Sequence, residues 1–207
     1  MSAARRPARR SARPLPLAAL LRDAHACTLC AEHLPHGPRP ILVVNAAARL
    51  LIIGQAPGKR VHQSGVPWDD PSGDRLRDWL GLDRERFYDE RRVALMPMGF
   101  CYPGTGASGD LPPRPECAPK WHPPLLAAMP RVTLVVLLSQ YAQAAYLGER
   151  CKATLTETVR AWREYDRFLP LPHPSPRNNL WLAKNPWFPK QVLPDLRKRV
   201  AKTIAAK

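Results

Sequence analysis

Two short segments combine residue types that could bind and activate a ligand. The first is Gly54-Gln55-Ala56-Pro57-Gly58, in which two glycines and a proline predict a tight turn whose backbone N–H groups can approach a ligand. The second is His173-Pro174-Ser175-Pro176-Arg177-Asn178-Asn179, a proline-stiffened loop with an imidazole, a hydroxyl, a cation and two amides. Taken singly, each segment also fits an ordinary surface turn.

Cysteine offers a third kind of chemistry. Cys27 and Cys30 are separated by two residues, Cys101 and Cys117 by fifteen, and Cys151 stands apart. The total of five is odd, and the N-terminal segment lacks the apolar region of a secretory signal. These features favour thiol or metal chemistry in a reducing compartment over disulfides, and they predict a cytoplasmic location.

The composition favours a polyanionic partner. The 207 residues include 32 Lys and Arg against 17 Asp and Glu, which gives a net charge of +15. This balance favours nucleic acid over an anionic membrane surface. The longest apolar run is much shorter than the roughly 18 residues of a transmembrane helix. We expect a monomer that binds DNA, with no membrane and no protein partner.

The chain begins with a strongly basic segment. Residues 1–14 contain five arginines and no acidic residue. We expect a disordered arm there, followed by a single domain over residues 15–207. Three hypotheses for the arm stay open: added affinity for phosphates, a solvated tail without a role, or a transit peptide for organelle import.

Four buried strands are predicted to position the two loops. Continuous apolar runs occur at residues 49–53, 93–96, 132–138 and 168–171. Helical patterns occur at residues 72–81, 140–147, 153–162 and 190–204. In the first of these helices, Ser72 is the expected N-cap and Gly81 the expected C-cap.

This alternation of strands and helices predicts an α/β fold. The expected arrangement is a three-layer α/β/α sandwich with a central four-stranded parallel sheet. Ligands of such sheets bind beyond the carboxyl ends of the strands, and both loops begin at such ends.

Together, the two loops resemble those of the uracil-DNA glycosylase superfamily in order, in their separation of roughly 115 residues and in their place after strands. The resemblance spans about residues 27–188. The first loop is similar to the water-activating and uracil-binding loop, and the second to the His-Pro-Ser loop that enters the minor groove. The resemblance implies a monofunctional DNA glycosylase of base-excision repair, which hydrolyses the N-glycosidic bond of uracil or another deaminated base. The alternative is a member that binds DNA or damaged bases with little or no turnover.

The resemblance also implies roles for single residues. His173 would donate a hydrogen bond to the departing base, Trp68 would stack on that base, and Gln55 would orient water or contact the base. A core position is the alternative for Trp68. The implied substrate-binding residues are Gly54, Gln55, Ala56, Gly58, Trp68, Ser175, Arg177 and Asn178. Ser175 and, outside this set, Ser72 would hold phosphates. Arg177 or Asn178 would fill the space that the flipped nucleotide leaves in the base stack.

The paired cysteines resemble the branch of the superfamily that holds a [4Fe-4S] cluster. The implied ligands are Cys27, Cys30, Cys101 and Cys117, and the cluster would be structural, tying the N-terminal segment to the 101–117 loop. Zinc bound by the same thiolates and unligated thiols are the alternatives. Cys151 lies outside the pattern.

The first departure from the superfamily concerns the water. Relatives carry Asp, Asn or Glu in the first loop to position it, whereas this chain has Gln55 and Ala56. Four nearby residues are possible substitutes, and the sequence does not choose among them. They are His62, Asp69, Asp70 and Asp74.

Two further departures concern the choice of base. The iron-sulfur branch has an asparagine that reads uracil in the segment where this chain has Met96-Pro97-Met98. Gly58 stands where another branch places a tyrosine against the methyl group of thymine. The sequence therefore leaves the preferred base open.

Overall fold

A four-stranded parallel sheet forms the centre of the protein in the computed structural model, which describes residues 16–107 and 109–206. The sheet order is β2-β1-β5-β6. Its strands are β1 (Leu50–Ile53), β2 (Val93–Leu95), β5 (Leu134–Leu138) and β6 (Phe168–Leu171). All four occur within the predicted apolar runs, and the parallel pairing confirms the predicted sheet. The predicted arm at residues 1–14 lies outside the described residues.

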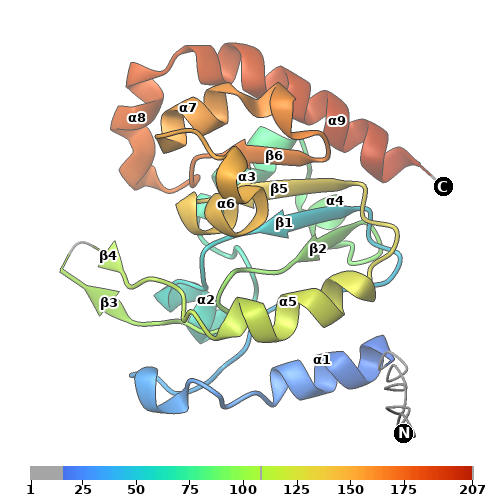
Figure 1. The fold of residues 1–207 in the computed structure, drawn as a ribbon, viewed down its shortest axis with the longest axis vertical. Coiled ribbons are helices and arrows are strands. Elements are labelled where there is room, and N and C mark those ends of the chain that lie inside the picture. Colours follow the sequence, from blue (N-terminus) through green and yellow to red (C-terminus); the bar gives the residue numbers. More distant parts are fainter. Residues whose placement is uncertain (1–15, 108, 207) are drawn as a thin grey trace, which may run out of the picture.

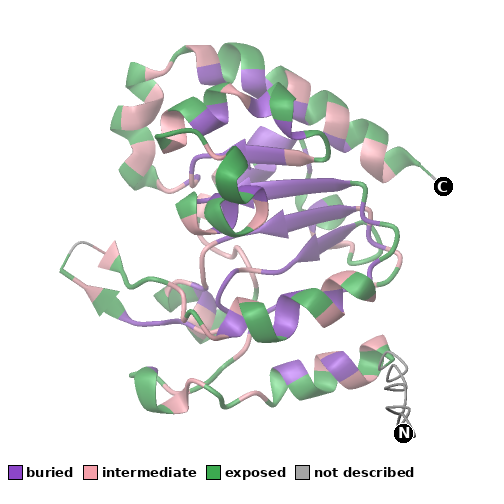
Figure 2. Ribbon diagram, viewed as in Figure 1, coloured by how far each residue is buried: buried purple, intermediate pink, exposed green. Residues whose placement is uncertain are grey.

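Alternate residues of the strands enter two separate cores. In β1, Leu51 and Ile53 join the core on one face, and Leu50 and Ile52 join the core on the other. All four strands are buried almost throughout, whereas the helices keep exposed outer faces (Figure 2). The sheet is therefore the middle layer of a three-layer α/β/α sandwich, as predicted (Figure 1).

Helices from both halves of the chain cover the sheet. One face carries α1 (Leu17–His25), α5 (Cys117–Ala127) and α6 (Gln140–Leu147). The other face carries α3 (Pro71–Leu80), α4 (Arg84–Tyr88), α7 (Leu155–Arg160) and α9 (Leu193–Ala205). Helix α1 packs on α5 and so forms an outer layer on the first face (Figure 1).

Shorter elements surround the edge of the sheet at which β1 and β6 end. They are α2 (Lys59–Ser64), α8 (Asn179–Lys184) and a hairpin of β3 (Thr105–Gly106) and β4 (Gly109–Asp110). The chain also has 3-10 turns at Ala31–His33, Gly148–Arg150, Trp162–Tyr165 and Pro176–Asn178, and a π-helical turn at Phe188–Val192. No helix in the described part of the chain is long and apolar enough to cross a membrane.

The start of α3 differs from the prediction. Asp70, rather than Ser72, is the N-cap, because its Oδ1 accepts a hydrogen bond of 2.8 Å from the N–H of Gly73. Pro71 then occupies the first helical turn, where its missing N–H costs nothing. Gly81 ends the helix with φ of +67°, as predicted.

The other predicted helices differ mainly in their ends. Helix α6 has the predicted bounds, and α7 is shortened to six residues by a capping box between Thr154 and Glu157 and by the turn that follows it. The predicted C-terminal helix is α9 preceded by the π-helical turn. Helix α5, which carries Pro123 and Pro124, had no helical signal in the sequence.

A buried glutamine ties the ends of two strands together. The side-chain Nε2 of Gln143, in α6, donates to the carbonyl of Leu171 at 3.0 Å and to that of Leu137 at 3.5 Å. Gln143 is only 2% exposed, so water cannot replace these bonds. Leu171 is the last residue of β6. Gln143 therefore fixes the point from which the histidine loop leaves the sheet.

We expect the substitution Gln143→Leu to destabilise the protein by about 1–3 kcal/mol, because it leaves the carbonyl of Leu171 buried without its donor. Equilibrium urea denaturation measures this change. Gln140→Leu is the matched control, since Gln140 begins the same helix but is exposed. Equal stability of the two variants would contradict the role given to Gln143.

Candidate active site

A cleft with a volume of about 390 Å³ opens where β1 and β6 end. Both loops selected in the sequence line it, and Pro97, which follows β2 closely, contributes to its wall. The structure brings together every predicted catalytic and substrate-binding residue in this cleft. These residues are Gly54, Gln55, Ala56, Gly58, Trp68, His173, Ser175, Arg177 and Asn178. Ser72 lines the cleft as well.

Hydrogen bonds inside the histidine loop fix the orientation of His173. The backbone N–H of Ser175 donates to Nδ1 of His173 at 3.2 Å, and Nδ2 of Asn178 donates to the His173 carbonyl at 2.6 Å. Because Nδ1 accepts, the neutral imidazole carries its proton on Nε2. The loop therefore presents His173 as a hydrogen-bond donor through Nε2.

The surroundings of His173 favour this neutral form. Burial lowers the pKa of His173 below its usual value, while the nearby Asp70 carboxylate acts in the opposite direction. Burial is the larger effect. At neutral pH the imidazole is accordingly neutral, and it can donate to a developing negative charge without first losing a proton.

Trp68 stacks against the ring of His173 at the cleft and has an unusual backbone conformation. The two rings are 5.6 Å apart between centroids, with an interplanar angle of 28°. Trp68 has φ of +59°, in the left-handed region that large side chains rarely adopt. The indole packs so closely on Gly54 that a Cβ there would lie 2.9 Å from it. The first loop thus needs glycine at position 54 to accommodate the aromatic ring.

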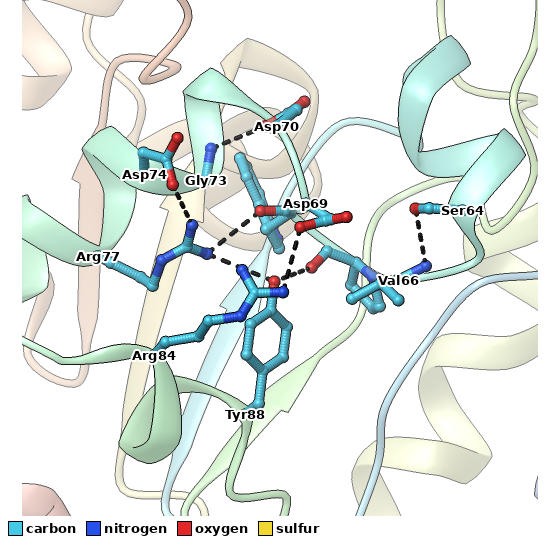
Figure 3. A network of polar contacts seen from close by, with 11 residues as sticks. Ser64, Val66, Asp69, Asp70, Gly73, Asp74, Arg77, Arg84 and Tyr88 are labelled. Atoms are coloured by element: carbon cyan, nitrogen blue, oxygen red, sulfur yellow. Dashed lines mark hydrogen bonds and ion pairs between the residues drawn. The ribbon is translucent and has the colours of Figure 1, made fainter.

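A polar network holds the backbone around Trp68, and Figure 3 shows its members Asp74, Arg77 and Tyr88. The buried guanidinium of Arg77 donates from Nη1 to the Trp68 carbonyl at 3.2 Å and pairs through Nη2 with Asp74 at 2.5 Å. The hydroxyl of Tyr88 donates to the carbonyl of Pro67 at 2.8 Å. Gly73 lies so close that a Cβ there would be 1.8 Å from the Trp68 carbonyl oxygen. Helix α3 and the residues after it therefore define the position of Trp68.

Of the four possible substitutes for a water-activating group, the structure places only Asp70 in the lining of the cleft. Asp69 forms an ion pair with Arg84 at 3.2 Å, and Asp74 forms the pair with Arg77 (Figure 3). His62 lies in a cluster of rings, 5.7 Å from the ring of Tyr102. A further carboxylate that the sequence analysis missed, Asp110, also lines the cleft.

Pro97 is held in the cleft wall by a buried histidine that sequence reasoning also missed. Nε2 of His122 donates to the Pro97 carbonyl at 3.0 Å, and Nδ1 accepts from the hydroxyl of Tyr146 at 2.7 Å. Burial lowers the pKa of His122 to about 4, so the ring is neutral at physiological pH. His122 lies in α5, which had no helical signal, and so no pattern placed it near the site.

Arg177 closes one side of the cleft against the β3–β4 hairpin. Its guanidinium occupies the position where a side chain at residue 109 would begin, since a Cβ on Gly109 would lie 1.7 Å from Nη1. Ser175 stabilises the same loop, because its Oγ accepts from the N–H of Arg177 at 3.2 Å. The histidine loop and the hairpin are therefore in contact at the rim of the cleft.

The four paired cysteines line a second cavity. Cys27 and Cys30 approach it from the segment after α1, Cys101 from the chain after β2, and Cys117 from the first residue of α5. Among the described residues, no three His, Cys, Asp or Glu side chains are grouped to hold a single metal ion. Cys151 is not in the lining of this cavity, and it packs at the edge of the core that α1, α5 and α6 cover.

Hydrogen-bond donors point at two of these sulfur atoms. The indole N–H of Trp121 donates to Sγ of Cys27 at 3.4 Å, and the backbone N–H of Phe100 donates to Sγ of Cys117 at 3.3 Å. Burial raises the pKa of Cys117 to about 12 and that of Cys101 to about 11. The raised pKa values mean that these two thiols keep their protons unless a metal cation displaces the protons. The N–H donors would then stabilise the negatively charged thiolates that bind the cation.

We expect Arg77→Met to destabilise the protein by about 1–3 kcal/mol, because the Trp68 carbonyl loses a donor in a half-buried site. Urea denaturation followed by tryptophan fluorescence measures the change. Arg86→Met is the control, because Arg86 is 62% exposed in a surface pair, and its loss should cost less than about 0.5 kcal/mol. If Arg77→Met were as stable as this control, Arg77 would not support the Trp68 backbone.

A comparison with protein families gives a match that covers most of the chain. The model of the uracil DNA glycosylase superfamily matches residues 42–197, which is more than half of the chain and includes both loops of the cleft. The match agrees with the order of the strands and with the position of the cleft. The chain therefore belongs to the uracil DNA glycosylase superfamily.

Proposed function

We propose that this protein is a monofunctional DNA glycosylase that removes uracil or another deaminated base by hydrolysing the N-glycosidic bond. One observation carries the proposal: an aromatic face, Trp68, and a neutral imidazole donor, His173, line one cleft at the carboxyl ends of the strands. The superfamily match supports action on DNA. The net charge of +15 supports binding to its phosphates.

The two residues would act on different parts of a flipped nucleotide. Stacking on Trp68 would compensate for the stacking that the base loses when it leaves the duplex, by about 1–3 kcal/mol. Nε2–H of His173 would donate to a carbonyl oxygen of the departing base, where negative charge develops as the bond to C1′ breaks. The lowered pKa of His173 suits this role, because the donor is present at neutral pH without a proton-transfer step.

A hydrolytic reaction fits the residues of the histidine loop. A glycosylase that also cleaves the strand uses an amine to form a Schiff base with the sugar. The histidine loop at residues 173–179 has no lysine. The proposed product is therefore an abasic site in an intact strand.

Selection of the base would depend on few side chains. Pro97 lies in the segment where the iron-sulfur branch has an asparagine that reads the edge of uracil. Gln55, two residues after β1, offers a side-chain amide in the cleft. Nε2 of Gln55 donates to the carbonyl of Leu111 at 3.4 Å, which leaves its Oε1 as an acceptor for a base or a water. We propose a broader choice of deaminated bases than a site with a dedicated asparagine would allow.

A specific observation also favours a second function, the binding of damaged DNA with little turnover. The first loop has Gln55 and Ala56 where relatives have Asp, Asn or Glu to position the water. Such a protein would use the same cleft and the same stacking, without rapid bond cleavage. Excision and binding must therefore be measured separately.

We also propose a [4Fe-4S] cluster held by Cys27, Cys30, Cys101 and Cys117. The supporting observations are the shared cavity and the N–H donors aimed at sulfur. Zinc bound by the same four thiolates is the alternative, and the metal content of the protein distinguishes the two. The cluster would be structural and would link the segment after α1 to the loop before α5.

The test of the proposed activity is the release of a base from a labelled duplex that contains one uracil. We expect excision that yields alkali-labile, unnicked strands, and we expect His173→Ala to slow the single-turnover rate by about 10²–10³-fold, the usual loss for a preorganised donor. His33→Ala is the control, because His33 is exposed in a 3-10 turn outside the cleft.

Three outcomes decide between the hypotheses. An inactive wild-type protein that binds the uracil duplex tightly would favour binding without turnover. Strand cleavage before alkali would contradict hydrolysis. Unchanged excision by His173→Ala would remove this residue from the mechanism.

The cluster has its own test. Protein purified without oxygen should be brown and should contain about four iron and four sulfide per chain, both lost in Cys101→Ser. Cys151→Ser should keep colour and iron, because Cys151 packs away from the cavity. A colourless protein with one zinc per chain would contradict the cluster and support the zinc alternative.

A further inference from the structure

A carboxylate far from both loops in sequence reaches the cleft. Asp110 is the last residue of β4, in the hairpin between Cys101 and Cys117, and it lines the same cleft as His173 and Trp68. Neither Gln55 nor Ala56 can accept a proton from water, so the first loop lacks a general base. Asp110, which comes from the β3–β4 hairpin, is therefore a candidate for the general base that the first loop lacks.

The hairpin orients one oxygen of this carboxylate. Thr105 and Asp110 are paired across the two short strands, and Oγ1 of Thr105 donates to Oδ1 of Asp110 at 3.5 Å. Oγ1 in turn contacts the hydroxyl of Tyr102 at 2.5 Å. Tyr102 is only 1% exposed, and its ring packs against His36 and His62. A buried residue thus anchors the chain of hydroxyls that leads to Asp110.

The other oxygen faces the first loop. A Cβ built on Gly58 would lie 3.3 Å from Oδ2 of Asp110, so this oxygen lies directly over the loop. The next residue, Leu111, accepts the hydrogen bond from Gln55. The hairpin therefore places a carboxylate oxygen beside the loop in which relatives carry the group that positions the water.

The neighbouring carboxylates are engaged in other contacts. Asp70 also lines the cleft, but its Oδ1 caps α3 through Gly73. Asp69 and Asp74 are bound to Arg84 and Arg77. Asp110 is thus the cleft carboxylate whose Oδ2 is directed at the first loop.

We propose that Asp110 is the general base of the reaction, which rests on the proposed glycosylase function. Oδ2 of Asp110 accepts a proton from water while the water oxygen forms a bond to C1′ of the flipped nucleotide. The bond from C1′ to the base nitrogen breaks, and its electron pair leaves with the base, whose carbonyl oxygen accepts the hydrogen bond from His173. The released base then takes up a proton from solvent and Asp110 returns its proton to solvent, so the products are the free base and an abasic site and the carboxylate is regenerated.

Three charged or titratable groups share this environment. Arg177 approaches from the histidine loop, where its guanidinium lies against Gly109. Asp70 and His173 line the cleft from α3 and from the same histidine loop. The pH dependence of the rate must therefore be compared between variants rather than judged from the wild type alone.

The test compares Asp110→Asn with Asp23→Asn, a control at an exposed residue of α1 outside the cleft, under single-turnover conditions on a uracil duplex. General-base catalysis contributes about 10²–10⁴-fold, so we expect a loss of that size for Asp110→Asn and a rate close to wild type for Asp23→Asn. The wild-type rate should rise with pH as a carboxylic acid loses its proton and then level off. Asp110→Asn should lack this rise, and Asp110→Glu should restore part of both the rate and the rise.

Binding to a duplex with 2′-fluoro-deoxyuridine, which resists hydrolysis, separates catalysis from folding. Asp110→Asn should bind this duplex at least as tightly as the wild type, because it removes a negative charge near the DNA. Excision that survives in Asp110→Asn, or a loss that leaves the pH profile unchanged, would overturn the role of Asp110 while the glycosylase function stands. An absence of excision in the wild type would overturn both.

Discussion

The left-handed backbone of Trp68 is the constraint on which the aromatic side of the cleft depends. Such a conformation costs on the order of 1–3 kcal/mol, so the surrounding structure must stabilise it. Here the buried Arg77 binds the Trp68 carbonyl, and Gly73 leaves room for that carbonyl. Both belong to α3, whose Leu76 and Trp79 are packed into the second core. The packing of one helix on the sheet therefore fixes an aromatic ring in the cleft.

The opposite side of the cleft is fixed by different means. β6 is an edge strand of the sheet and contains Pro170, which has no backbone N–H to donate. An edge strand tolerates this loss, whereas an inner strand would not. Gln143 binds the end of this strand, and the loop that follows holds His173 through Ser175 and Asn178. Two differently supported walls thus meet at the carboxyl ends of the strands, and the hydrogen bonds of the second wall set the orientation of His173.

The sequence was sufficient to predict the sheet, the three layers and both loops, because buried parallel strands are continuous apolar runs and the loops carry glycine and proline at fixed places. It was not sufficient for α5, because Pro123 and Pro124 hide a helix that only packing stabilises. His122, within that helix, was missed for the same reason. Asp110 was missed because its hairpin has strands of two residues, too short for any alternation to appear. The N-cap of α3 was assigned wrongly, because Asp70 and Ser72 are both good caps and only the backbone path decides between them.

The proposed roles come from three parts of the chain: Trp68, just before α3, would supply the stacking face, the histidine loop the donor, and the β3–β4 hairpin a carboxylate. A crystal structure of the protein with a duplex that carries 2′-fluoro-deoxyuridine tests this arrangement most directly. We predict a flipped nucleotide whose base lies against Trp68 and whose carbonyl oxygen accepts a hydrogen bond from Nε2 of His173. A base that stays stacked in the duplex, or one bound away from Trp68 and His173, would contradict it.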